Sequence, residues 1–285
     1  DIDYTASRSY FIAQRMLGDQ ATGLVIGNIG NTELQWETTN RVTAGLQGNF
    51  MNNRLSVRLN WFKSWTDNLL SLSRLAYPSG LKENWSNGGK LENSGFDVTA
   101  SAKVVNLKNF HWELGASVGR YTNKLTALPN NDRPFETEIY GATVLSKVGQ
   151  SVGVFYGWQT EGVYATAEAA EADGKYFVDS KGKRNYFKAG DVSFKDMNGD
   201  NKISDADRTV IGNPNPDIYG NLSTSMNWKN LTLSAVFNYS LGNDIYNYQR
   251  SLIESGSYFL NQTTAMNSRW TGEGQQTRIP RISYE

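Results

Sequence analysis

The sequence contains no cysteine and only one histidine among its 285 residues. Without cysteine, disulfide frameworks, thiolate metal sites and cysteine nucleophiles are all excluded. Basic and acidic residues are equal in number, at 28 each, so the chain has no excess of positive charge. Because nucleic-acid binding depends on such an excess, we expect no nucleic-acid partner.

Long hydrophobic runs are also absent. No eighteen consecutive residues are apolar and the mean hydropathy is −0.53, which excludes a membrane-spanning helix. A membrane β-barrel stays possible, because only alternate residues of its strands face lipid. Proline is scarce, at 6 residues, whereas Trp, Tyr and Phe number 8, 15 and 12, and this composition favours strands.

Apolar and polar residues alternate along three pairs of segments, each pair joined by a short turn. The pairs are 34–50 with 55–66, 96–104 with 110–118, and 218–228 with 231–239, and only Phe62 and Lys63 interrupt the alternation in the first pair. Strands of soluble domains usually have about five or six residues. These lengths therefore predict an all-β fold that forms part of a large antiparallel transmembrane β-barrel, spanning residues 1–285.

Long connections separate the pairs, at about 68–88 and at 123–217. Short turns at one end of a barrel and long loops at the other are typical of outer-membrane proteins. We therefore expect residues 123–217 to form a long extracellular loop region. By alternation, the polar side chains that would line the lumen are Glu37, Arg41, Arg58, Asp97, Lys103 and Glu113. A soluble β-sandwich with one buried face would also alternate, and it is the competing interpretation.

An acidic motif lies inside the long connection, at residues 196–207. Counted from Asp196, it has the spacing of a calcium loop, in which alternate oxygen ligands surround the cation. The predicted structural Ca²⁺ ligands are Asp196, Asn198, Asp200, the Lys202 carbonyl, Ser204 and Asp207. Asn201 stands where glycine is usual, and asparagine tolerates the left-handed backbone needed there. A solvated turn without an ion is the alternative.

An aromatic segment, 152–164, belongs to the same connection. Exposed rings can stack on ligands, so Tyr156 and Trp158 are candidate substrate contacts, although packing within the loop would use them equally well. The sequence contains no nucleophile elbow, Walker loop, dinucleotide fingerprint or zinc-protease motif. We therefore predict that the chain is not an enzyme.

Several motifs resemble those of the SusC/RagA-type TonB-dependent outer-membrane transporters of Bacteroidetes. The most specific are GDVSFKD at 190–196, NGD at 198–200 and DRTVIGNPNP at 207–216, and further matches occur at 30–37, 52–55, 87–96 and 155–158. The resemblance implies a signal peptide, a plug, a TonB box and a barrel of about 22 strands. This chain resembles only a later part of that barrel.

The resemblance also implies a function. It indicates an importer in the cell outer membrane that takes up glycans or peptides together with a SusD-like lipoprotein, energised by TonB through regions that this chain does not match. The partners would be outer-membrane lipid, the lipoprotein, TonB and an oligosaccharide or peptide ligand. The alternative is a soluble extracellular binding module or adhesin with a calcium-stabilised loop.

Overall fold

The computed structural model describes residues 6–16, 21–74, 81, 83–256 and 261–282. The chain forms two compact units. The sheet unit comprises Asp1–Phe135, Ser146–Val152 and Asn215–Asn243, and the insert unit comprises Glu136–Leu145, Gly153–Pro214 and Asp244–Glu285. No helix in the described ranges is long and apolar enough to cross a membrane.

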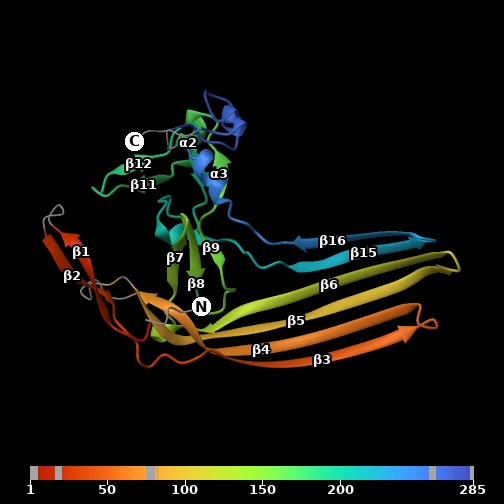
Figure 1. Ribbon diagram of the computed structural model, residues 1–285. Coiled ribbons are helices and arrows are strands. Elements are labelled where there is room, and N and C mark those ends of the chain that lie inside the picture. The colour runs from red at the N-terminus through yellow and green to blue at the C-terminus, as the bar shows by residue number, and fades with distance from the viewer. Residues whose placement is uncertain (1–5, 17–20, 75–80, 82, 257–260, 283–285) are drawn as a thin grey trace. The chain divides into compact units, whose positions relative to one another are not determined.

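Six antiparallel strands dominate the sheet unit, in the order β16-β15-β6-β5-β4-β3 (Figure 1). They are β3 (Thr38–Phe50), β4 (Leu55–Arg74), β5 (Glu83–Leu107), β6 (Phe110–Ala127), β15 (Ile218–Trp228) and β16 (Leu231–Leu241). The three predicted pairs are therefore hairpins, and β15 joins β6 although about ninety residues separate them. The unit also contains the short helix α1 (Pro129–Asp132) and a hairpin of β1 (Tyr10–Met16) and β2 (Ala21–Asn28), which the sequence did not predict.

The register gives the sheet two chemically different faces. One row across the six strands reads Leu46, Leu59, Val98, Val118, Gly220 and Tyr239, and the adjacent row reads Gln47, Arg58, Thr99, Ser117, Asn221 and Asn238. Because successive side chains point to opposite faces, the first row lies on an apolar face and the second on a polar face. Alternation in the sequence is thus converted into a two-sided sheet.

The apolar face is open to its surroundings. Leu46 is 74% exposed, Leu222 52% and Phe237 67%. In a β-sandwich these side chains would be sealed against a second sheet. Their exposure argues against the sandwich interpretation.

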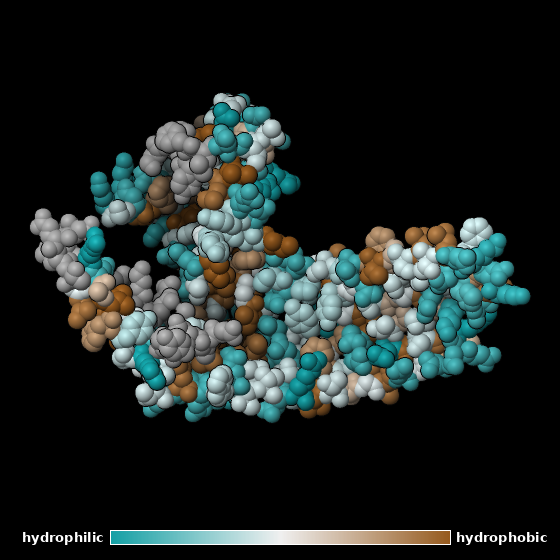
Figure 2. Space-filling model, viewed as in Figure 1, coloured by the Kyte–Doolittle hydropathy of each residue, from teal (hydrophilic) through white to brown (hydrophobic). Residues whose placement is uncertain are grey.

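Tight turns close the hairpins at one end of the sheet. Met51, Asn52 and Asn53 all have positive φ angles of 56°, 54° and 64°, and the Arg54 amide donates to the Phe50 carbonyl at 3.1 Å. Asparagine adopts this left-handed conformation more readily than most residues. Figure 2 shows that the turn end of the sheet is predominantly hydrophilic.

The strands are longer than predicted at the opposite end. The expected connection at 68–88 is largely strand, because β4 continues to Arg74 and β5 begins at Glu83, and β6 continues to Ala127. By contrast, β3 is shorter than predicted, because it begins only at Thr38. The strand ends were mispredicted because the alternation of apolar and polar residues stops at bulges between Thr66 and Leu70, whereas strand pairing continues past them. Asn68 has a φ of 57° at these bulges.

The predicted extracellular loop region is a folded body for most of its length. In the insert unit a four-stranded sheet has the order β14-β9-β8-β7, and two smaller sheets pair β10 with β13 and β11 with β12. The strands are β7 (Phe135–Ile139), β8 (Ala142–Ser146), β9 (Val154–Trp158), β10 (Thr160–Val163), β11 (Tyr176–Val178), β12 (Arg184–Tyr186), β13 (Val192–Phe194) and β14 (Arg208–Gly212). The helices are α2 (Ala167–Asp173), α3 (Tyr248–Ile253) and the 3₁₀ turns η2 (Asp205–Asp207) and η3 (Thr264–Ser268).

A small core holds the insert unit together. Val154, Tyr164, Ala170, Ile203 and Met266 are each less than a tenth exposed. The rings of Tyr164, Phe177 and Phe194 surround Phe187 with centroids 5.7–6.4 Å apart. Such aromatic packing gives a segment of short strands enough buried apolar area to fold as a body.

Candidate functional site

The predicted lumen residues of the strands share the polar face of the sheet. The Arg58 guanidinium donates to Gln47 Oε1 at 3.1 Å, and Asn60 Nδ2 donates to Asp97 Oδ2 at 2.7 Å. Lys103 and Glu113 are cross-strand neighbours, and the Arg41 guanidinium lies 4.5 Å from the centre of the Phe62 ring. The face is therefore a set of cross-strand polar pairs suited to contact with water or a polar ligand.

Glu37, also predicted to line the lumen, accepts a hydrogen bond from the backbone of β4. It precedes β3, and its carboxylate accepts a hydrogen bond from the Leu70 amide at 2.8 Å. The residue thus braces the bulged part of β4.

Asn87 forms the main polar cross-link of the same region. Its Nδ2 donates to the carbonyls of Gln35 at 2.9 Å and Asn68 at 2.8 Å, and its Oδ1 accepts from the Gln35 amide at 2.8 Å. One side chain therefore satisfies three backbone groups, two at Gln35 and one at Asn68, beside the bulged part of β4. Alternation gave no signal for this residue, although it lies in the 87–96 motif.

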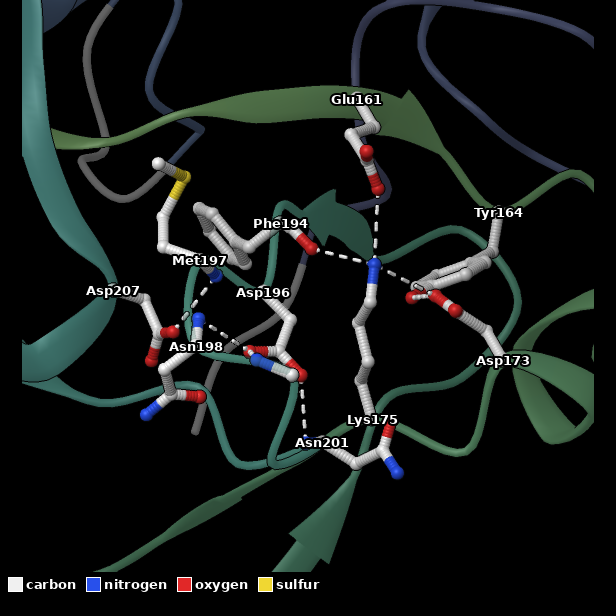
Figure 3. A network of polar contacts seen from close by, with 11 residues as sticks. Glu161, Tyr164, Asp173, Lys175, Phe194, Asp196, Met197, Asn198, Asn201 and Asp207 are labelled. Atoms are coloured by element: carbon white, nitrogen blue, oxygen red, sulfur yellow. Dashed lines mark hydrogen bonds and ion pairs between the residues drawn. The ribbon is translucent and has the colours of Figure 1, made fainter.

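The acidic loop at 196–207 has the left-handed residue that was expected at its sixth position. Asn201 has a φ of 58° and Gly199 a φ of 77°. The Asp196 carboxylate accepts the amides of Asn198 at 3.2 Å, Gly199 at 2.7 Å and Asn201 at 2.6 Å, as Figure 3 shows in part. The loop thus closes around its first acidic residue.

Asp207 closes the other end of the loop and is fully buried. One of its oxygens accepts the Met197 amide at 3.0 Å, and the other accepts the Ser204 amide at 2.8 Å. Ser204 and Asp207 form a capping box at the start of η2. The carboxylate therefore joins the two ends of the twelve-residue loop.

The donor set fits calcium in kind, because it consists of hard oxygen atoms from side chains and one carbonyl. In the described part of the chain, however, no three carboxylate, imidazole or thiol groups converge on a common metal position. The carboxylates of Asp196 and Asp207 instead accept backbone N–H groups. The calcium site stays a prediction.

A buried lysine lies beside this loop. Helix α2 ends at Gly174, whose φ of 64° reverses the chain and places Asp173 and Lys175 on either side of the turn. Lys175 Nζ contacts Glu161 Oε2 at 2.9 Å, Asp173 Oδ2 at 3.1 Å and the Phe194 carbonyl at 2.7 Å (Figure 3). Its side chain is only 9% exposed. One ammonium group thus joins β10, β13 and α2.

The charges of this network are fixed by its geometry. Burial alone would lower the pKa of Lys175, but hydrogen bonds to Glu161 and Asp173 outweigh burial and raise the pKa above its ordinary value. Burial, together with the hydrogen bond to the Asp173 carboxylate, raises the pKa of the Tyr164 hydroxyl to about 12. Lys175 is therefore charged and Tyr164 neutral at physiological pH.

Backbone hydrogen bonds connect Tyr176, the residue after Lys175, to the acidic loop. The Tyr176 amide donates to the Asn201 carbonyl at 3.0 Å, and the Ile203 amide donates to the Tyr176 carbonyl at 2.8 Å. Because Tyr176 follows Lys175 directly, the lysine network positions the acidic loop.

Tyr156 and Trp158, the candidate substrate contacts, lie in β9. Arg208 extends over both rings, with its guanidinium 4.6 Å from the Tyr156 centroid and 5.2 Å from the Trp158 centroid. Trp158 Nε1 also donates to the Ser204 carbonyl at 2.8 Å, yet the residue is 40% exposed. The rings stabilise the insert unit, and part of Trp158 is exposed to solvent.

The insert unit also contains a polar hollow of about 850 Å³. It is lined by Thr160, Glu161, Gly162, Val163, Ala165, Val192, Gln276, Thr277 and Arg278. None of these residues is aromatic, and the sequence gave no signal for the hollow because its walls come from three separate segments, at 160–165, 192 and 276–278.

Comparison with known proteins gives the context of these features. The sequence model of the family "TonB dependent receptor-like, beta-barrel" matches residues 4–270. The chain belongs to this family of TonB-dependent receptor barrels.

Two relatives illustrate the similarity. The chain is 30% identical over 272 residues to TonB-dependent receptor P3 of Formosa agariphila, an alignment that covers 93% of this chain and 26% of the relative. It is 26% identical over 257 residues to TonB-dependent receptor SusC of Bacteroides thetaiotaomicron, covering 85% of this chain and 23% of SusC. The chain therefore spans about a quarter of the length of these relatives.

Solved structures share the fold. The structure of the RagAB peptide transporter superposes with a TM-score of 0.73 at 23% identity, covering 97% of this chain and 29% of that chain. The "open-open" state of the RagAB peptide importer gives a TM-score of 0.71. Together with the family match, these results confirm the predicted SusC/RagA-type resemblance and the all-β barrel fold. The six strands of the sheet described above form an open part of such a barrel.

The receptor barrel explains why the sheet has two faces. In a transmembrane barrel the apolar face contacts lipid and the polar face lines the lumen. The family is one of receptors and not a class of enzymes. Two segments of the insert unit lie in sequence between β6 and β15, and the third, Asp244–Glu285, follows β16.

Proposed function

We propose that this chain is the strand-forming part of a TonB-dependent importer in the outer membrane, which takes up an oligomeric nutrient. The exposed apolar face of the six-stranded sheet carries this proposal, because hydrocarbon is the environment that stabilises such a face. A soluble module or adhesin would have to bury Leu46, Leu222 and Phe237.

The nutrient in this proposal is a glycan or a peptide, captured together with a SusD-like lipoprotein. The peptide class is supported by one similar structure, a peptide transporter, and the glycan class follows from the SusC-type resemblance of the sequence motifs. The accessible part of Trp158, beside Tyr156, is the proposed ligand contact in the insert unit. TonB would act through regions of the full-length receptor that this chain does not match.

Uptake by intact cells tests the proposal. Cells that express the full-length receptor should accumulate labelled oligosaccharides or labelled peptides, and depletion of TonB should abolish the accumulation. Import of one class alone identifies the nutrient. Accumulation that persists without TonB, or a receptor that stays in the soluble fraction, would contradict the proposal.

The acidic loop has a structural role in this proposal. Ca²⁺ held by Asp196, Asn198, Asp200, the Lys202 carbonyl, Ser204 and Asp207 would fix the loop at the cell surface, where even an affinity on the order of 10⁻⁴ M keeps such a site filled. The left-handed Asn201 and the hard oxygen donors support it.

Limited proteolysis of the full-length receptor tests this ion. Addition of Ca²⁺ should slow cleavage within 196–207, and chelator should reverse the protection. D196N/D200N should abolish the response to Ca²⁺, whereas D205N, outside the predicted ligand set, should retain it. Equal cleavage of the unchanged receptor with Ca²⁺ and with chelator rules the ion out.

A further inference from the structure

The apolar face of the sheet ends in a belt of charged residues. The face runs along β6 through Trp112, Leu114, Ala116 and Val118, and the next positions of the same parity are Arg120, Thr122 and Lys124. Because β6 side chains alternate, Arg120 and Lys124 point to the lipid side and not to the lumen. The belt lies toward the end of the sheet opposite the tight turns.

Neighbouring strands contribute to the same belt. Arg120 lies opposite Phe96, and Phe96 lies opposite Trp61. The following positions on the lipid side add Lys63 in β4 and Glu92 in β5, with Lys124 directly opposite Glu92. We call Lys63, Lys90, Arg120 and Lys124 the basic rim.

The charge of the rim is only partly neutralised. Lys63 pairs with Glu92 at 2.9 Å and Lys90 pairs with Asp67 at 2.9 Å. Arg120 and Lys124 are both exposed, and within the described residues neither forms an ion pair of its own. Two positive charges therefore stay available at the edge of the hydrocarbon-facing surface.

A shallow apolar groove crosses β5, β6, β15 and β16 on the same face of the sheet, nearer the tight turns than the rim. It has a volume of about 440 Å³, and its walls include Ala100, Ala102, Leu114, Ala116, Leu222 and Phe237. The alanines of β5 and β6 form a depression between larger side chains. Ala116 and Arg120 are four residues apart on one strand, which is about 14 Å.

A second hollow, of about 360 Å³, lies at the rim itself. Asn40, Trp65, Asp67, Lys90 and Thr126 line it, together with Thr66 and Leu91. The rim thus combines basic side chains, a Trp at the boundary of the apolar face and space for a headgroup. Trp and Lys are the residues that anchor membrane proteins at an interface.

We propose that the basic rim and the groove form a site for one phosphate-bearing acylated lipid of the outer leaflet. Arg120 and Lys124 bind its phosphate, because charge-assisted hydrogen bonds from basic side chains are the strong contacts of phosphate groups. An acyl chain lies in the alanine groove. This inference rests on the membrane placement proposed above.

Native mass spectrometry of the full-length receptor in detergent tests the site. The probes are a phosphorylated acylated disaccharide lipid and the same lipid after enzymatic dephosphorylation. We expect preferential binding of the phosphorylated lipid, and R120Q/K124Q should weaken that binding about thirtyfold, as expected from two basic side chains near an anionic group. R58Q/K103Q, which removes the same charge from the polar face, should leave it unchanged.

A second variant tests the groove without changing charge. Ala116→Leu fills the depression and should weaken binding of the acylated lipid several-fold. Excess inorganic phosphate should not displace the lipid, because the acyl chain contributes to binding. Displacement by phosphate alone would show a free-anion site and overturn the proposal.

The outcomes separate this inference from the importer proposal. If the receptor inserts into membranes and imports its nutrient but binds both lipids equally, the lipid site is wrong and the importer proposal stands. If R58Q/K103Q lowers lipid binding as much as R120Q/K124Q, the rim is not specific and the inference fails. A receptor that does not enter membranes would contradict both.

Discussion

The sheet unit and the insert unit place polar and apolar residues in opposite ways. In the six-stranded sheet, Ser64 and Thr66 are buried while Leu46 and Leu222 are exposed. In the insert unit, Val154 and Met266 are buried, as in a water-soluble domain. The exposed apolar side chains of the sheet suit contact with hydrocarbon, whereas the buried apolar side chains of the insert unit suit a fold surrounded by water.

The largest expected effect is a charge placed in the apolar band. Leu222→Arg should reduce the stability of the bilayer-inserted receptor by about 2–4 kcal/mol, because arginine on a lipid face near the midplane is strongly unfavourable. The neighbouring substitution Ser223→Arg faces the lumen and should cost less than about 1 kcal/mol. Denaturant titration in lipid vesicles measures both, and equal losses would show that the two faces are not different.

A second prediction concerns the insert unit alone. Lys175→Met removes a buried ammonium and leaves Asp173 and Glu161 without their cation, which should destabilise this unit by about 2–3 kcal/mol. Pulse proteolysis reports that loss. Lys181→Met, at an exposed turn between β11 and β12, should change stability by less than about 0.5 kcal/mol. Identical protease sensitivity of the two variants would refute a structural role for the network.

The capping box gives a smaller effect. Asp207→Asn replaces one carboxylate oxygen with an N–H donor and should lower the stability of the loop by about 1–2 kcal/mol. Asp205→Asn is the matched control, because the Asp205 side chain is 88% exposed. Hydrogen exchange at the Met197 and Ser204 amides should accelerate in the first variant only. No change at these amides would show that Asp207 does not close the loop.

The smallest effect is a dependence on pH. Burial tends to raise the pKa of Asp196, but hydrogen bonds from Asn201, Gly199 and Asn198 outweigh it and lower the pKa below the ordinary value of 3.8. Stability from this group is therefore present above pH 3.8 and is lost as the pH falls through the lowered pKa. Cleavage of the loop by an acid-active protease should increase in that range. Asp196→Asn should remove this dependence, and a retained dependence would assign it to another group.

The hairpins could be predicted from sequence because one face of each strand is apolar for the whole width of a bilayer. The ends of the strands could not be predicted, because they extend past the apolar part of the sheet. Lys63 was an interruption of the pattern in sequence, whereas in the sheet it marks the edge of the apolar band and pairs with Glu92. Beyond Thr66, β4 continues to pair with β5 across bulges, and alternation is lost there.

The insert unit was harder to predict because its strands have only three to five residues. Such short segments carry almost no periodic signal. One backbone feature of the acidic loop was nevertheless predicted, the left-handed conformation of Asn201 at the sixth position of the motif. The polar hollow and the Lys175 network depend on contacts between distant segments, which spacing does not reveal.

The length of β5 determines how far the strand extends beyond the membrane. Its 25 residues extend for about 85 Å at about 3.4 Å per residue, whereas the apolar band of an outer-membrane barrel is about 25 Å tall. Even with the usual tilt, much of the strand extends beyond the bilayer. A fluorophore attached at position 86 should therefore report water, while one attached at position 98 should report hydrocarbon.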